Sequence, residues 1–298
     1  MNYLAVNIRG IGGVEKPKWI SNLVKENKIS FFCIQEVQVS NVDPITVGRY
    51  WGKADMEWEL VDARGRPGGL ISVWDLGMFS KQRVVKHDSF LLTSGTLAGS
   101  NMYINIVNVY APCDFMRRRS LWEDLKLIKE SSSEGVWIMA DDFNEVREEQ
   151  ERLNSRFDNQ GAMIFNNFIA EAGLVEYQMS GYKFTYMSDD GSSLSKIDRI
   201  LMCDGFMNKW PIAWFEELTK HVSNHSPLLL SSKSADFGTI PFRFYNSWLE
   251  EDGIGEVIKK VMEESINGGN GMKELANILK NLKIGIKEWR RLAKTQEE

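Results

Sequence analysis

Short apolar runs alternate with longer amphipathic stretches along the first 230 or so residues, and this alternation restricts the fold more than any other feature. Eight runs are brief and partly β-branched, as buried strands are: Tyr3–Val6, Ser30–Ile34, Leu70–Trp74, Tyr103–Val109, Val136–Met139, Lys183–Met187, Lys196–Met202 and Leu228–Ser231. Three stretches place apolar residues on one helical face, namely Lys18–Glu26, Arg118–Lys129 and Ala162–Ala172. This mixed order predicts a four-layered α/β sandwich, two mixed β-sheets flanked by helices, rather than a doubly wound sheet.

The sequence changes character after about residue 235. Two apolar stripes at helical spacing follow, from Ile254 to Met262 and from Leu275 to Trp289, and Asn267–Gly271 separates them. We therefore expect a domain over 1–235 and a C-terminal helical extension, a linker, over 236–298. The linker ends without a helix-capping signal, which indicates a truncated chain.

Composition narrows the class of protein. Apolar residues make up 43% and charged residues 26%, which is ordinary for a globular protein with a core. The net charge of −5 does not indicate nucleic-acid binding, but it does not exclude a nuclease, because a carboxylate-built metal site adds negative charge. Three widely spaced cysteines indicate reduced thiols. With no signal peptide and no apolar run near the ~18 residues of a membrane helix, we expect an intracellular protein without a membrane partner.

Polar side chains stand where the predicted strands end, the usual place for function in layered α/β proteins. They come from six segments of the chain: Asn7; Glu36; Asn108 and Tyr110; Asp141, Asp142 and Asn144; Asp198; and His225. If these strand ends converge, they form a carboxylate-rich pocket with one histidine. Hard oxygen ligands suit Mg²⁺, whereas zinc would need a thiolate or histidine cluster. The pattern is suited to hydrolysis of a phosphodiester.

The segments around these residues resemble, in order, the motifs of the endonuclease/exonuclease/phosphatase superfamily: Leu4–Gly10, Ile34–Glu36, Asn108–Pro112, Asp142–Asn144, Ile197–Arg199 and Ser223–Pro227. One such motif is a weak signal, but six in order are specific. Spacing and flanks, including Asn144–Arg147, Pro241–Phe244 and Trp248–Leu249, are most similar to the endonuclease domain of plant LINE-type (non-LTR) retrotransposon polyproteins. The resemblance covers about residues 1–250, and the tail is similar to the linker before the reverse transcriptase.

This resemblance implies an endonuclease that depends on Mg²⁺, or on Mn²⁺, and nicks one strand of DNA in the nucleus. It also implies a reverse-transcriptase domain downstream in a longer polyprotein. Among the residues, it implies that Glu36 binds the metal with Asn7 beside it, and that Tyr110 and Asn144 position the scissile phosphate.

Proton transfer falls, by the same resemblance, to Asp142 and His225 jointly, and Asp198 supports the histidine and the metal region. Thr185 matches a position that touches nucleic acid near the cut. Arg117 and Arg118 follow the Tyr110 motif, where they could hold DNA phosphates or simply begin a solvated helix.

Two residues depart from the family pattern. Asn224 stands where the last motif has aspartate, so it cannot supply charge to His225 and is expected to favour the wrong tautomer. Asp141 stands where glycine is usual, so its side chain is expected to crowd the metal and raise the pKa of Asp142. Both leave open a catalytically impaired copy that retains only nucleic-acid binding. Hydrolysis of inositol phosphates or other small phosphoesters is a third interpretation, because one fold serves several substrates.

Overall fold

The computed structural model describes residues 1–63, 68–100, 102–132, 134–232, 253–265, 275 and 278–289. The chain divides into two compact units, Met1–Ser234 and Ala235–Glu298. Three features expected from the sequence lie outside the described residues: the domain boundary near residue 235, the motif segments within 241–249, and the break at Asn267–Gly271. Within the described ranges, no helix is both long and apolar enough to cross a bilayer.

A seven-stranded mixed sheet is built around the N-terminal strand. Its order in space is β11 (Met179–Ser180), β15 (Trp214–Glu217), β16 (Leu228–Ser231), β1 (Asn2–Asn7), β2 (Phe31–Gln35), β4 (Leu70–Trp74) and β3 (Glu57–Val61). Strand β1 runs parallel to β2 and antiparallel to β16. Helix α1 (Glu15–Glu26) connects the parallel pair, and α2 (Pro44–Trp51) follows β2.

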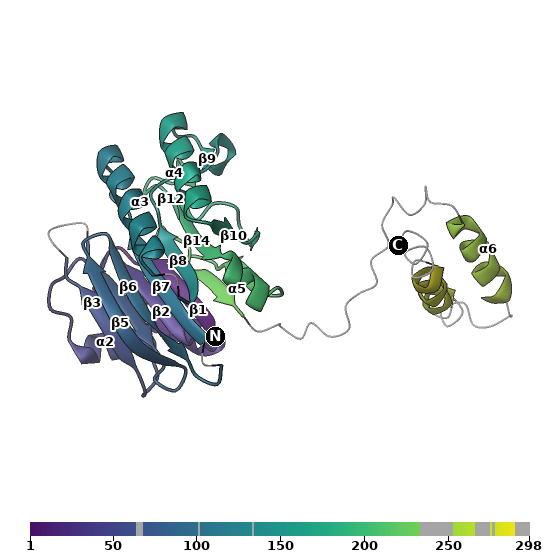
Figure 1. Ribbon diagram of the computed structural model, residues 1–298, viewed down its shortest axis with the longest axis horizontal. Helices are drawn as coiled ribbons and strands as arrows, with labels where there is room; N and C mark the ends of the chain where they lie inside the picture. Colours follow the sequence, from purple (N-terminus) through teal and green to yellow (C-terminus); the bar gives the residue numbers. More distant parts are fainter. Residues whose placement is uncertain are drawn as a thin grey trace. The chain divides into compact units, whose positions relative to one another are not determined.

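A six-stranded sheet forms the other half of the sandwich. Its order is β10 (Leu174–Glu176), β14 (Asp198–Cys203), β8 (Val136–Asp142), β7 (Met102–Tyr110), β6 (Phe90–Leu97) and β5 (Phe79–His87). Helix α3 (Phe115–Glu130) connects the parallel strands β7 and β8. Helix α4 (Asn159–Glu171) packs beside α3 on the outer face of this sheet (Figure 1). Helix α5 (Asp204–Lys209) follows β14.

Three very short strands form a separate small sheet with the order β12 (Tyr186–Met187), β13 (Leu194–Ser195) and β9 (Arg152–Leu153). A 3₁₀ turn, η1 (Glu149–Glu151), leads into β9.

Alternation of side chains along the strands produces the layers. In β1, Tyr3 and Ala5 belong to the core between the two sheets, whereas Leu4 and Val6 pack with residues of α1 and α2. In β8, Ala140 faces the core between the sheets and Met139 packs with α3 and α4. The predicted four-layered sandwich is confirmed.

Helices also make up the described part of the second unit. Helix α6 (Ile254–Ser265) meets a helical segment over 278–289 at Gly285, where an added Cβ would lie 3.2 Å from Val257 and from Val261. Ile254 and Ile286 are buried. The apolar stripes at 254–262 and 275–289 therefore predicted helices correctly over the described residues.

Asp141, at the end of β8, is a buried carboxyl in an unfavourable backbone conformation. It is fully buried with a φ of 104°, which non-glycine residues rarely adopt. Neither of its oxygens has a hydrogen-bond partner in the described part of the chain. Burial raises the pKa of Asp141 well above its usual range, and the charges of Asp198 and Asp142 raise it further. This side chain therefore costs folding free energy.

Replacing Asp141 with glycine is expected to raise the free energy of unfolding by about 1–3 kcal/mol, because it removes an unpaired buried carboxyl and glycine adopts positive φ freely. Urea unfolding at neutral pH measures the change. Asp141→Asn is the matched control, since it keeps a side chain at the same backbone angle and should gain less. A glycine variant less stable than the parent would contradict this account.

Candidate active site

The strand ends that the sequence singled out converge at one edge of the sandwich. Asn7 ends β1, Glu36 follows β2, and Tyr110 and Asp142 end β7 and β8, so two parallel pairs deliver their last residues to the same place. A cavity of about 250 Å³ opens there. It is lined by Arg9, Glu36, Tyr110, Cys113, Asp142, Asn144, Arg152, Tyr186, Ser195, Ile197 and His225.

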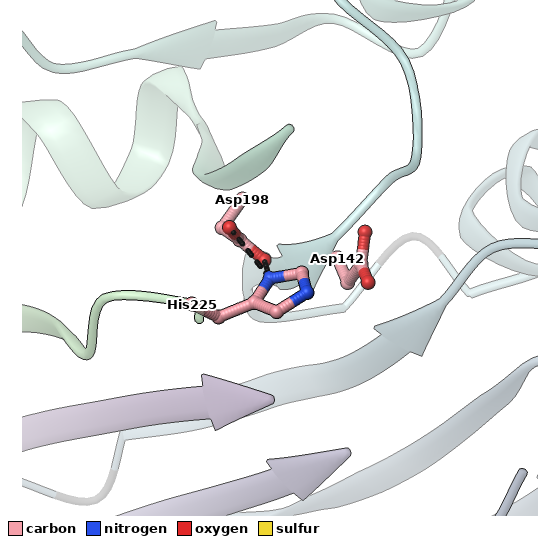
Figure 2. Close-up of side chains that lie close together, drawn as sticks. All are labelled: Asp142, Asp198 and His225. Atoms are coloured by element: carbon pink, nitrogen blue, oxygen red, sulfur yellow. Dashed lines mark hydrogen bonds and ion pairs between the residues drawn. The ribbon is translucent and has the colours of Figure 1, made fainter. Parts of the chain in front are cut away.

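His225 lines this cavity and lies between the carboxylates of Asp198 and Asp142 (Figure 2). Its Nδ1 is 2.9 and 3.0 Å from the two oxygens of Asp198. Burial lowers the pKa of His225, but the charge and hydrogen bonds of Asp198 outweigh burial and raise it to about 9. At neutral pH the imidazole is therefore cationic, and its Nδ1–H donates to Asp198.

Asp142 faces Asp198 across the antiparallel pairing of β8 with β14. Burial raises the pKa of Asp142 to about 7, and the nearby charge of Asp198 adds to the effect. The Nδ2 of Asn7 donates to one oxygen at 2.9 Å, and the backbone N–H of Asn144 donates to the other at 3.0 Å. A carboxyl held this way and titrating near neutrality is suited to proton transfer.

Glu36 enters the cavity from the other sheet. It has a φ of 52°, so the chain turns sharply as β2 ends. The hydroxyl of Tyr110 donates to Glu36 Oε1 at 2.6 Å, and Gln38 Nε2 donates to Oε2 at 3.3 Å. Burial and the bond to Glu36 raise the pKa of the Tyr110 phenol, so this hydroxyl remains a donor. Tyr110 therefore fixes the position of the Glu36 carboxylate.

The donor set fits a hard divalent cation. Asp142, Asp198 and His225 each place one potential ligand atom within 4.8 Å of the others. The cationic imidazole of His225 has no free nitrogen lone pair for a metal, and Asp198 is fully buried and does not line the cavity, so both are poor ligands. Each oxygen of Glu36 accepts one hydrogen bond and, as a carboxylate oxygen, keeps a lone pair for a cation. Glu36 lines the cavity, and its predicted role as a ligand of the metal stays a prediction.

Asn7 lies against Asp142 rather than against Glu36. Its Nδ2 donates to Asp142, and its Oδ1 accepts from the backbone N–H of Arg9 at 3.1 Å. Its expected role beside the metal stays a prediction.

Asn144 lines the cavity, and the loop that carries it is firmly held. It has a φ of 48°, and its Nδ2 donates to the carbonyl of Ala111 at 2.6 Å. This bond ties the segment after β8 to the segment after β7. The geometry is compatible with the predicted role of Asn144 in positioning a phosphate.

Thr185 does not line the cavity as a nucleic-acid contact would. It is fully buried, and its Oγ1 accepts from the backbone N–H groups of Ile197 and Asp198 at 3.2 and 3.0 Å. The structure gives Thr185 a supporting role at the start of β14 in place of the expected contact with nucleic acid.

Asn224 does not orient His225, and the expectation that it selects the imidazole tautomer is wrong. Asn224 lies in a bend directly before His225, and the two side chains bond different partners. The Nδ2 of Asn224 accordingly donates to Asp189 at 3.1 Å, and Asp198 holds the imidazole.

Asp141 does not line the cavity, so the expected crowding of a metal is not found. It lies near Tyr3 and Cys33 in the core between the sheets; burial raises the pKa of both groups, and Asp141 adds to the effect. The raised pKa of Asp142 arises from burial and Asp198.

Arg118 is buried in an ion pair rather than free for DNA. Its guanidinium donates to Glu145 Oε2 at 2.9 Å and to the carbonyls of Pro112 and Cys113. The side chains of Arg118 and Glu145 are 11% and 2% exposed. This pair joins the first turn of α3 to the loop that follows β8. Arg117 is exposed beside a neighbouring cavity and stays a candidate for DNA binding.

Six cavity residues were not predicted as site residues: Arg9, Cys113, Arg152, Tyr186, Ser195 and Ile197. Arg9 lies in the first motif and could have been found there. Arg152 and Tyr186 lie in two-residue strands, which are too short to show any periodicity.

The fold is similar to that of solved nucleases. An AP endonuclease, LMAP from Leishmania major, has a TM-score of 0.62 at 14% identity, over 77% of this chain and 86% of that one. The 3′–5′ exonuclease NExo from Neisseria meningitidis has a TM-score of 0.61 at 15% identity, over 78% and 99%. For the endonuclease domain of TRAS1, a telomere-specific non-LTR retrotransposon, the values are 0.56 and 15%, over 77% and 97%.

No family model and no curated protein matches the sequence. At the identities of the solved structures the likeness establishes the fold alone. The chain has the α/β sandwich of the endonuclease/exonuclease/phosphatase type.

Asp198→Asn is expected to lower the pKa of His225 from about 9 towards or below the ordinary imidazole value of about 6.5. The variant removes the negative charge that raises this pKa, so the lowering effect of burial dominates. NMR titration of the ring signals measures this, and His225→Asn identifies the signal among the three histidines. Since the folded pKa is raised, the stabilisation by this pair is complete below about pH 6.5 and is lost as pH rises through about 9. An unchanged pKa in Asp198→Asn would contradict the assigned pair.

Arg118→Ala is expected to lower the free energy of unfolding by about 3–5 kcal/mol, because it leaves the Glu145 carboxylate buried without its ion-pair partner. Urea unfolding measures the loss. Arg119→Ala is the matched control, since Arg119 is the exposed neighbour on the same helix and should leave stability unchanged. Adding Glu145→Ala to Arg118→Ala should recover part of the loss; no recovery would argue against the ion pair as its cause.

Proposed function

We propose that the protein is a metal-dependent phosphodiesterase that nicks DNA. The observation that carries this proposal is the convergence, in one cavity, of Glu36, Asp142 and a His225 held cationic by Asp198. A carboxylate for a hard cation, a carboxyl that titrates near neutrality and a positive imidazole are the groups that cleavage of a phosphodiester requires.

Each side chain has a definable part in such a reaction. Asp142, with a pKa of about 7, can take a proton from the attacking water or return one to the leaving oxygen. His225 can donate from Nε2 to a phosphate oxygen, and its positive charge stabilises the charge that develops there. Tyr110 keeps the Glu36 carboxylate in place. A bound Mg²⁺ or Mn²⁺, held by Glu36, would act as a Lewis acid towards the phosphate.

DNA is the substrate favoured over small phosphoesters. Support comes from the resemblance of six ordered motifs to the endonucleases of non-LTR retrotransposons, together with the structural likeness to the TRAS1 endonuclease domain. Action in the nucleus and a reverse-transcriptase domain beyond residue 298 follow as parts of the same proposal.

The main argument for a catalytically impaired copy does not agree with the geometry of the site. It rested on residue 224 holding the imidazole, and Asp198 does this instead. An aspartate at position 224 would face Asp189, to which Asn224 now donates. The proposed enzyme is therefore an active one, and the aspartate of the family pattern is not expected to improve it.

Supercoiled plasmid with Mg²⁺ is expected to be converted to nicked circles by the parent, and Glu36→Gln is expected to slow this roughly 100-fold or more, because the amide loses the charge that holds the cation. Agarose-gel kinetics measure the rates, and EDTA should abolish nicking. Asn224→Asp should nick no faster than the parent.

The other outcomes separate the alternatives. A silent parent and an active Asn224→Asp would establish the impaired copy. A parent that spares DNA but releases phosphate from inositol phosphates would establish the small-phosphoester hydrolase. Nicking that persists in Glu36→Gln or in EDTA would remove the proposed metal site.

A further inference from the structure

Arg152 is a positively charged side chain in the catalytic cavity, and no acidic partner for it is found among the described residues. It lines the cavity together with Glu36, Asp142 and His225. Its Nε is buried and has no hydrogen-bond partner among the described residues, and no ion pair of Arg152 is found there. A buried donor without an acceptor costs free energy, so such a group calls for an explanation.

The acidic residue next to Arg152 in sequence is paired with another cation. Glu151, its neighbour in sequence, accepts from the buried guanidinium of Arg199 and from the backbone N–H of Arg147. Arg9, which also lines the cavity, donates to the Asp189 carboxylate and is therefore neutralised. Arg152 differs from Arg9 in keeping its charge available to the cavity.

The small three-stranded sheet determines which cavity residues lie in line with Arg152. Tyr186 pairs with Ser195 across β12 and β13, and Ser195 pairs with Arg152 across β13 and β9. These three residues form one row across the strands, and all three line the cavity. An aromatic ring, a hydroxyl and a cation in a row provide a wall on which a nucleic-acid strand can lie, with a phosphate at the cationic end.

We propose that Arg152 binds an anionic phosphate oxygen of the substrate strand, at a point separate from Glu36 and His225. This deepens the proposed function and rests on it, since it assigns the side of the cavity along which the strand runs. The guanidinium offers several donors in a fixed plane, which suits a phosphate better than a point charge.

The test is binding of a fluorescein-labelled DNA duplex in EDTA, followed by fluorescence anisotropy over a series of salt concentrations. Arg152→Gln is expected to weaken binding about tenfold and to reduce the slope of log K against log salt by roughly 0.9, the value for one phosphate contact. Arg152→Lys should keep the slope and lose part of the affinity. Arg156→Gln is the matched control, because it removes the same charge from an exposed side chain four residues away.

Equal effects of Arg152→Gln and Arg156→Gln, or no effect of either, would overturn the proposal, as would a parent that does not bind the duplex. Thermal unfolding checks that the variants are folded, and if Arg152→Gln is not, an Arg152→Lys variant with unchanged affinity and slope overturns it. Inorganic phosphate that displaces the duplex more strongly than salt of equal ionic strength would assign the contact to free phosphate. Failure to nick, with Arg152-dependent binding intact, would refute the proposed function but not this contact.

Discussion

The buried ion pair between His225 and Asp198 is the interaction on which the rest of the site depends. Strands β8 and β14 place Asp142 and Asp198 opposite each other, and two such carboxylates would repel one another strongly in a dry interior. The cationic imidazole lies between them and offsets this repulsion. The amide of Asn7, on the other sheet, then donates to the Asp142 carboxylate, so both sheets contribute to this group of charges.

Much of this arrangement could be predicted from the sequence, for one physical reason. Strands buried on both faces read as unbroken apolar runs, and the polar residue that ends each run marks the edge of the sheet. Glu36, Tyr110, Asp142 and Asn144 were found in this way and His225 from its motif, and all line the same cavity. The hairpin β5–β6 was missed because β5 has a single buried residue, Phe79, and because the small and polar residues Thr93–Thr96 interrupt the apolar run of the buried strand β6.

Side-chain partners far apart in sequence could not be predicted. Arg118 was expected to hold DNA because its partner Glu145 lies 27 residues away, in a loop that meets it only in the folded chain. Asn224 was expected to orient its neighbour His225, but it lies in a bend and donates to Asp189, while Asp198 holds the imidazole. Residues that are adjacent in a motif therefore need not contact each other, whereas the registers of β8 with β14 and of β9 with β13 identify which residues lie opposite each other.

The position of β1 between β2 and β16 also has a consequence for the order of events in the cell. This central strand lies at the N-terminus, but its antiparallel partner β16 and the adjoining His225 are among the last residues of the first unit to leave the ribosome. A nascent chain that ends before them has Glu36 and Asp142 but neither the closing strand nor the imidazole. The cavity with its complete set of titratable groups can therefore form only after nearly the whole first unit has been synthesised.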